Sequence, residues 1–224
     1  MPLGFVPRPL GWWWLVAVTF ALGAGCASTH TVRPLGRGNA VVHASLGGPL
    51  VNVSGAVIPT PILTLGGALG VRADSEVTLH ADATAALFGV AHVEPGVAFH
   101  PVIRDGGLMP TLTTTLSLHL LTDFSATRIA PQATLAGAWR IQRRHLIYAG
   151  ADLAVASGSA ARLVLGPLLG AEARLGRRVG VSLEAKWLAP YYDVAPLAPS
   201  WISPGNHGYF SVLLGVNTYL GDVR

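Results

Sequence analysis

The sequence predicts an all-β protein, an antiparallel transmembrane β-barrel of about ten strands, within a range of about 8–12. Apolar residues make up 51% of the chain and charged residues 12%. No stretch after residue 26 offers the ~18 consecutive apolar residues of a membrane-spanning helix. From residue 39 onward, segments of about 9–13 residues instead alternate apolar and polar positions, as strands between lipid and a lumen do. The 27 glycines and 16 prolines are spread along the chain, which disfavours long helices.

The first 25 residues have the features of an export signal. Arg8 is their only charge, an apolar stretch runs from Gly11 to about Gly23, and small residues precede Cys26. On these residues the N-terminus resembles that of a bacterial lipoprotein, which implies cleavage before Cys26 and its acylation, for instance with palmitate. Cys26 is the only cysteine, so it has no partner for a disulfide. An ordinary secretory signal and an uncleaved anchor are the alternatives.

The resemblance also implies a location. Lipoproteins are retained in the inner membrane by an acidic residue after the acylated cysteine, and this chain has Ala27 there. We therefore expect the outer membrane of a Gram-negative envelope. The expected partners are outer-membrane lipid, the lipoprotein sorting machinery and the barrel assembly machinery. The expected domains are a signal peptide over residues 1–25, a lipidated linker over 26–38 and the barrel over 39–224.

Ten segments are expected to be strands. The clearest runs from Val181 to Trp187, with apolar residues at odd positions and polar residues at even positions, so that the two sets point to opposite faces. The segments around Val77 and from Leu112 to Leu120 alternate in the same way. In chain order, the expected strands are 40–47, 60–71, 76–84, 88–100, 110–121, 127–140, 145–155, 163–175, 178–188 and 208–220.

The links between these segments support a barrel with both ends in the periplasm. Outer-membrane barrels have short periplasmic turns and longer external loops. The links after the second, fourth, sixth and eighth strands are compact, polar and carry arginine, whereas the alternate links include the longer stretches 48–59 and 189–208. A short link near 85–87 is the exception. In its alternation, together with Cys26, the mature chain resembles small outer-membrane β-barrel proteins.

Charged side chains of both signs are expected inside the barrel. Buried charges are costly unless they are paired, and a barrel of about eight strands is just filled by its side chains, so we expect a packed polar network in the lumen. A narrow transport pathway is the alternative; no long segment is left over as a plug, and a wide pore is not expected. The predicted lumen-facing residues are His80, Asp82, Glu94, His119, Arg140, Asp152, Glu172, Arg174, Glu184 and Lys186, with His43 and His92 beside them.

Catalytic and metal-binding patterns are weak in this sequence. None of the eight histidines has a short metal-ligand spacing and no cysteine accompanies them, so we expect neither a metal nor another cofactor. Ser117 and His119 share one strand face, as do His80 and Asp82. A Ser–His pair with an acid on a neighbouring strand could perform acyl transfer, as in outer-membrane acyl hydrolases. Neighbours two apart on a strand are common by chance, however, so we do not expect an enzyme.

The stretch from Pro190 to Pro204 is the most distinctive loop. Its prolines restrict the chain, and Tyr191, Tyr192 and Trp201 offer rigid contact area for a partner or glycan. An interfacial aromatic girdle with a lid over the barrel mouth is the other interpretation. Nucleic acid is not an expected partner, because 14 basic residues remain against 11 acidic ones once Arg8 is removed.

Three functions remain open on the sequence. The favoured one is an outer-membrane β-barrel lipoprotein with a structural or surface-display role and no catalytic activity. The second is a narrow solute channel in the same membrane. The third is a lipid-anchored periplasmic β-protein that never enters the bilayer.

Overall fold

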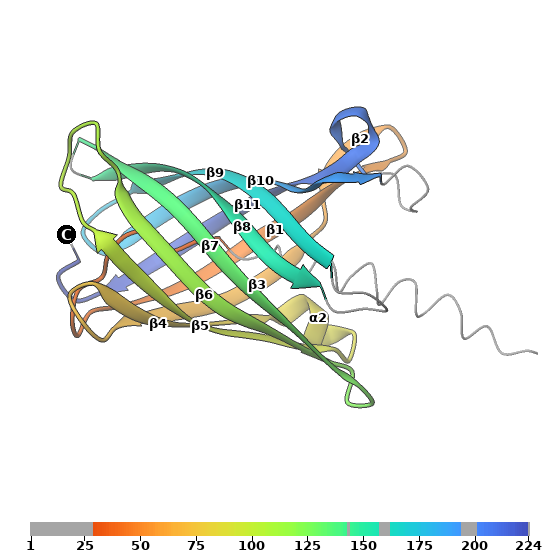
Figure 1. Ribbon diagram of the computed structural model, residues 1–224, viewed down its shortest axis with the longest axis horizontal. Helices are drawn as coiled ribbons and strands as arrows, with labels where there is room; N and C mark the ends of the chain where they lie inside the picture. Colours follow the sequence, from red (N-terminus) through yellow and green to blue (C-terminus); the bar gives the residue numbers. More distant parts are fainter. Residues whose placement is uncertain (1–28, 143, 157–161, 194–200, 224) are drawn as a thin grey trace, which may run out of the picture.

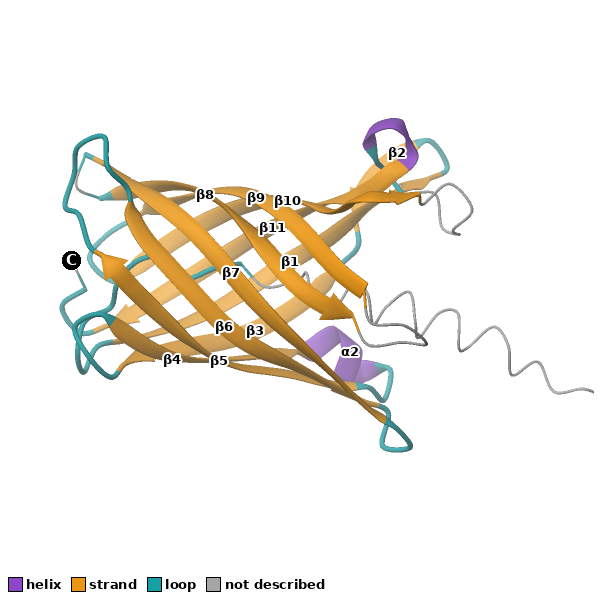
Figure 2. Ribbon diagram, in the orientation of Figure 1, coloured by secondary structure: helices purple, strands orange, loops and turns teal. Residues whose placement is uncertain are grey.

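The computed structural model describes residues 29–142, 144–156, 162–193 and 201–223, and the predicted signal peptide and Cys26 lie outside these ranges. The described part of the chain is almost entirely strand (Figures 1 and 2). The elements are β1 (Ala40–Val53), β2 (Ala56–Pro59), β3 (Ile62–Gly70), β4 (Ser75–Asp82), α2 (Ala83–Leu87), β5 (Ala91–Val102), β6 (Thr111–Thr122), β7 (Thr127–Ile141), β8 (His145–Ala156), β9 (Arg162–Arg174), β10 (Val179–Asp193), η1 (Pro204–Asn206) and β11 (His207–Leu220).

The sheet closes on itself. Each strand of the wall pairs antiparallel with its neighbour in sequence, and β11 pairs with β1 from Ala40↔Leu220 to Pro49↔Ser211. Among the described residues, β1 and β3 to β11 form this wall, while β2 pairs only with the far part of β1. The predicted fold class, an antiparallel barrel of about ten strands, is therefore confirmed. Closure leaves no unpaired edge in the wall.

The link predicted over 48–59 is wrong, because β1 does not end near Gly47. Strand β1 continues to Val53 and folds back as β2 through a two-residue turn, in which Ser54 and Gly55 have φ values of 51° and 89°. Within β1, Gly47 has a φ of 140°, and a Cβ there would be 2.1 Å from the Val212 carbonyl oxygen. A glycine is required there, because no side chain fits between the two backbones.

The two ends of the barrel differ. Four links, β3–β4, β5–β6, β7–β8 and β9–β10, meet at one end with the C-terminus, which we call the turn end; we call the opposite end the loop end (Figure 1). The prediction of a short link near 85–87 is wrong. The link between β4 and β5 contains helix α2, which lies at the loop end and has its N-terminus capped by Asp82. The short loop-end link is Asp123–Ala126 instead, where hydrogen bonds from Ser125 lower the pKa of the Asp123 carboxyl.

The wall has an apolar outside and a polar inside. Outward side chains such as Leu79, Leu135 and Leu183 are 55%, 59% and 54% exposed, and most strands of the wall contribute to this outer surface. The neighbouring inward positions are polar and buried, as at Ser182, Glu184 and Lys186. Among the described residues, no helix is both long and apolar enough to span a membrane.

The first residues that the structure describes occupy the lumen. The segment Thr29–Leu35, which we call the luminal segment, buries Arg33 and Leu35 to 1% and 2% exposure. Val32 packs against inward residues of β7, β8 and β9. The sequence leaves no long segment as a plug, but this segment of seven residues enters the lumen. The segment lacks an alternating pattern and is too short to be read as an element, which is why the sequence suggested only a linker.

Candidate functional site

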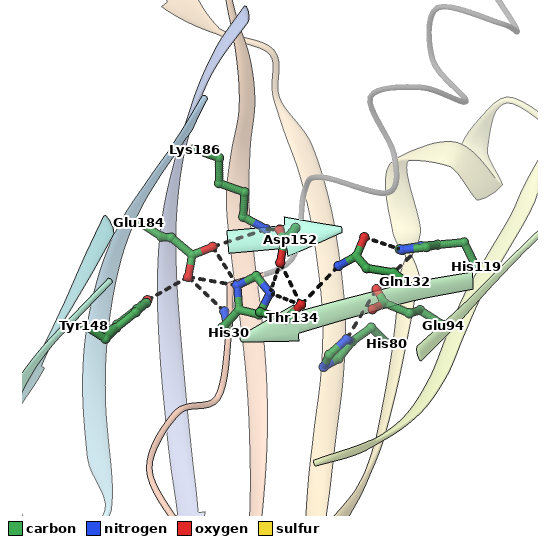
Figure 3. A network of polar contacts seen from close by, with 10 residues as sticks. All are labelled: His30, His80, Glu94, His119, Gln132, Thr134, Tyr148, Asp152, Glu184 and Lys186. Carbon is green, nitrogen blue, oxygen red and sulfur yellow. Dashed lines mark hydrogen bonds and ion pairs between the residues drawn. The ribbon is translucent and has the colours of Figure 1, made fainter. Parts of the chain in front are cut away.

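Glu184 is the centre of the polar network in the lumen (Figure 3). Its side chain is fully buried. One carboxylate oxygen accepts hydrogen bonds from the His30 amide at 3.0 Å and from the Tyr148 hydroxyl at 2.8 Å. The Nζ of Lys186 lies 3.3 Å from Glu184 and 3.4 Å from Asp152, and the His30 ring lies between the same two carboxylates at 3.1 and 3.0 Å. Two carboxylates thus surround two basic groups, which offsets the cost of burying all four.

The network continues across the lumen through uncharged groups. The hydroxyl of Thr134 donates to Asp152 at 2.7 Å, and Gln132 donates to Thr134 at 3.5 Å. The Gln132 carbonyl oxygen lies 2.9 Å from the Nε2 of His119, and the other nitrogen of His119 lies 3.1 Å from His92. The contacts from Asp152 of β8 through Thr134 and Gln132 of β7 to His119 of β6 can be followed in Figure 3. The contact of His119 with His92 extends this series to β5.

Glu94 lies beside a group of histidines at the end of this series of polar contacts. Its carboxylate is 3.6 Å from the Nδ1 of His80 and 3.8 Å from the Nδ1 of His119. The rings of His43 and His80 meet edge to face at 4.7 Å. Gly66 makes room for them, because a Cβ there would be 2.3 Å from His80 and 2.8 Å from His43. The His43 ring nitrogens have no hydrogen-bond partner among the described residues.

A second charged group lies nearer the turn end. Arg33 of the luminal segment donates to Glu172 from its Nε at 3.0 Å and from its Nη2 at 2.9 Å. The other oxygen of Glu172 accepts hydrogen bonds from Asn217 at 3.0 Å and from the Tyr219 hydroxyl. Every lone-pair direction of this buried carboxylate is thus used, which is the condition for burying such a pair.

The luminal segment is held at a third point through its backbone. The Leu35 amide donates to Glu76 at 2.6 Å, and the same oxygen lies 3.0 Å from the Nε2 of His100. The other nitrogen of His100 lies 3.0 Å from the Thr113 hydroxyl. The contacts at His30, Arg33 and Leu35 together fasten the segment to β10, β9 and β4 respectively.

The structure brings most of the predicted lumen residues together, with two exceptions. Arg140 is half-buried and pairs with the exposed Asp105 at the turn end, at 2.7 Å. Asp82 is buried but caps α2 through the Ala85 amide. The predicted residues in the networks described above are His80, Glu94, His119, Asp152, Glu172, Glu184 and Lys186, and Arg174 lies beside Tyr219 with its guanidinium 4.3 Å from the ring centroid.

Sequence reasoning missed the residues that complete these networks. The sequence places His30 and Arg33 in a linker, and its patterns do not distinguish Glu76, His100 or Tyr148 as site residues. Glu76 is at an even position of the segment around Val77, so the alternation already assigned it to the inner face. No local signal marks His30 or Arg33, since their partners lie more than 130 residues away in the chain.

The predicted aromatic contacts have different settings. Trp201 packs on Tyr209 with ring centroids 5.5 Å apart and pairs with Val51 as an isolated bridge, so it closes over the β1–β11 side of the loop end. The predicted start of the loop at Pro190 is wrong, because β10 continues to Asp193 and includes Tyr191. Tyr191 is 57% exposed, and its hydroxyl donates to the Leu163 carbonyl. The side chain of Tyr192 lies outside the described residues.

The polar network of the lumen does not bring Ser117 and His119 together as a catalytic pair. His119 is bound to Gln132 and His92, and both Ser117 and His119 are buried on the polar inner face. Within the described ranges, no group of three or more His, Cys, Asp or Glu residues has a geometry that could hold a metal ion.

The comparisons with known proteins concern the fold. No protein-family model matches the chain, and no curated protein matches it in sequence. The translocator domain of autotransporter NalP from Neisseria meningitidis aligns with a TM-score of 0.45 and 12% identity, over 92% of this chain and 93% of that one. The KdgM porin aligns with a TM-score of 0.41 and 7% identity, over 80% and 98%. OprG from Pseudomonas aeruginosa aligns with a TM-score of 0.29 and 10% identity, over 83% and 97%.

Proposed function

We propose that this chain is an outer-membrane β-barrel lipoprotein with a structural or surface-display role, a closed lumen and no catalytic activity. The observation that carries the proposal is the inverted polarity of the closed wall, with apolar side chains outside and ion pairs inside. A soluble protein of this size would bury its leucines and expose its charges. Lipid is the surrounding that stabilises the opposite arrangement.

Aromatic side chains at the loop end support the membrane placement. Trp187 and Phe210 are paired on neighbouring strands at outward-facing positions, with ring centroids 6.0 Å apart. Aromatic residues at the border of the apolar band are typical of the membrane interface, where a ring meets both hydrocarbon and water.

The luminal segment is the reason to expect a closed lumen. A barrel of about eight strands is just filled by its own side chains, and one of ten is only slightly wider. In this barrel the additional space holds Thr29–Leu35, tied to the wall at His30, Arg33 and Leu35. A structural role requires no pathway through such a lumen, and display uses the β1–β2 hairpin and the loop-end links.

Planar-bilayer recordings test this closed state. We expect the purified protein to give no steady conductance, because the segment and its ion pairs fill the lumen. The double variant His30→Ala/Arg33→Ala is expected to give discrete conductance steps, because both side-chain attachments of the segment are lost. Arg37→Ala is the matched control, since Arg37 is exposed and precedes β1.

A boiling-dependent gel shift in SDS would confirm that each variant forms a closed barrel before it is recorded. Steady conductance of the unmodified protein would contradict the closed lumen and favour the narrow solute channel. Silent recordings of a folded double variant would show that the wall side chains alone close the lumen.

Lipid attachment at Cys26 is the finer part of the proposal. We expect Cys26→Ala to abolish incorporation of labelled palmitate and to leave the N-terminus uncut at this position, because the thiol is the acylated group. Two residues separate Cys26 from Thr29, which is 3% exposed. The measurement is metabolic labelling with mass spectrometry of the N-terminal peptide, and Ser28→Ala is the control. Labelling that persists in Cys26→Ala would contradict the lipoprotein assignment.

A further inference from the structure

A cavity of about 640 Å³ opens at the turn end of the barrel. Its lining comes from parts of the chain that are far apart in sequence: the luminal segment, the β7–β8 turn, the β9–β10 turn and the C-terminal residues. Five of its side chains are arginines, and we call it the arginine cavity. The arginines are Arg33, Arg144, Arg174, Arg177 and Arg178.

The two inner arginines hold the turns that carry the outer three. Arg33 donates to the Arg144 carbonyl at 2.8 Å, and Arg174 donates to the Arg177 carbonyl. The Arg178 carbonyl accepts from the Tyr219 amide at 2.7 Å. The backbones of Arg144, Arg177 and Arg178 are therefore anchored to the wall and the luminal segment, while their side chains are exposed at the mouth.

Positive charge is in excess around this cavity. Among the described residues, the lining holds five arginines and one carboxylate, that of the exposed Asp222. Glu172 does not line the cavity, and its carboxylate is bound to Arg33. None of Arg144, Arg177 and Arg178 forms an ion pair with a carboxylate of the described ranges. Guanidinium groups bind phosphate through paired hydrogen bonds.

We propose that the arginine cavity binds a phosphate monoester group. Such a group carries about −1.5 to −2 charges near pH 7, so it matches the excess of the site better than a single carboxylate does. The phosphate can belong to a lipid headgroup or to a soluble molecule, since both present the same oxygens. The proposed function determines only from which side of the membrane the ligand reaches the cavity. Binding itself requires only the folded barrel.

Calorimetry and native mass spectrometry of the whole protein in uncharged detergent test the site. The soluble probe is glucose 6-phosphate, and the lipid probe is phosphatidic acid, which also carries a phosphate monoester. We expect Arg177→Gln/Arg178→Gln to weaken binding at least tenfold. The matched control is Arg72→Gln/Arg104→Gln, which removes two exposed arginines of the same end that do not line the cavity, and we expect a change under twofold.

Each outcome decides the proposal. Binding of glucose 6-phosphate that is lost only in the cavity variant supports a soluble ligand, and selective loss of phosphatidic acid supports a lipid headgroup. No binding of either probe, equal losses in the cavity and control variants, or equal affinity for citrate would overturn the phosphate site. An unchanged boiling-dependent gel shift shows that the variants are folded, so failure here is distinct from failure of the barrel proposal.

Discussion

Replacing Glu184 with alanine is expected to lower the free energy of unfolding by about 3–5 kcal/mol, the usual effect of removing one partner of a buried ion pair. Glu184 is fully buried and binds His30, Tyr148 and Lys186. Without it, the Tyr148 hydroxyl loses its acceptor, and His30 and Lys186 each lose one of the two carboxylates that face them, while Asp152 stays beside both. Urea unfolding in lipid vesicles, followed by tryptophan fluorescence, measures the change.

Asp105→Ala is the matched control for this effect. It also removes an ion-paired carboxylate, but the Asp105 side chain is 85% exposed at the turn end, where it pairs with Arg140. Exposed pairs contribute about 0–1 kcal/mol, so we expect a change within that range. Glu184→Gln, which keeps an acceptor for Tyr148, is expected to lie between the two. Equal effects of Glu184→Ala and Asp105→Ala would contradict the role of the luminal network in stability.

Replacing the neighbouring Leu183 with arginine is expected to block assembly into the membrane. Leu183 is 54% exposed on the outer surface, on the opposite face of β10 from Glu184. An arginine at the middle of the bilayer costs about 2–4 kcal/mol in a barrel of this type. The measurement is the fraction of protein that resists carbonate extraction from membranes and shows the boiling-dependent gel shift.

Leu175→Arg separates membrane depth from a general effect of added charge. Leu175 is 72% exposed and lies in the β9–β10 turn, outside the apolar band. Charge near the interface costs about 0–1 kcal/mol, so we expect this variant to assemble as the unmodified protein does. Normal assembly of Leu183→Arg would contradict the membrane placement and favour the anchored periplasmic protein.

The strands and the side of the wall that each residue faces could be predicted from sequence. Alternation is a local property with a period of two, so Val181 to Trp187 show it without knowledge of any other strand. The expected strand over 127–140 corresponds to β7 at Thr127–Ile141, and that over 145–155 to β8 at His145–Ala156. The errors lie at the loop-end limits of the strands: β1 continues past Gly47, a capped helix follows Asp82, and β10 extends to Asp193.

Strand alternation is enough to predict a barrel with a charged interior, because the apolar and polar faces of the strands require opposite surroundings. Which charges meet, and what fills the lumen, depend on the folded arrangement of distant segments. The contacts of His30 with Glu184 and of Arg33 with Glu172 join residues more than 130 positions apart, and they depend on strand register and on closure of β11 against β1. The arginine cavity arises in the same way, because its arginines are brought together only when the wall closes around the luminal segment.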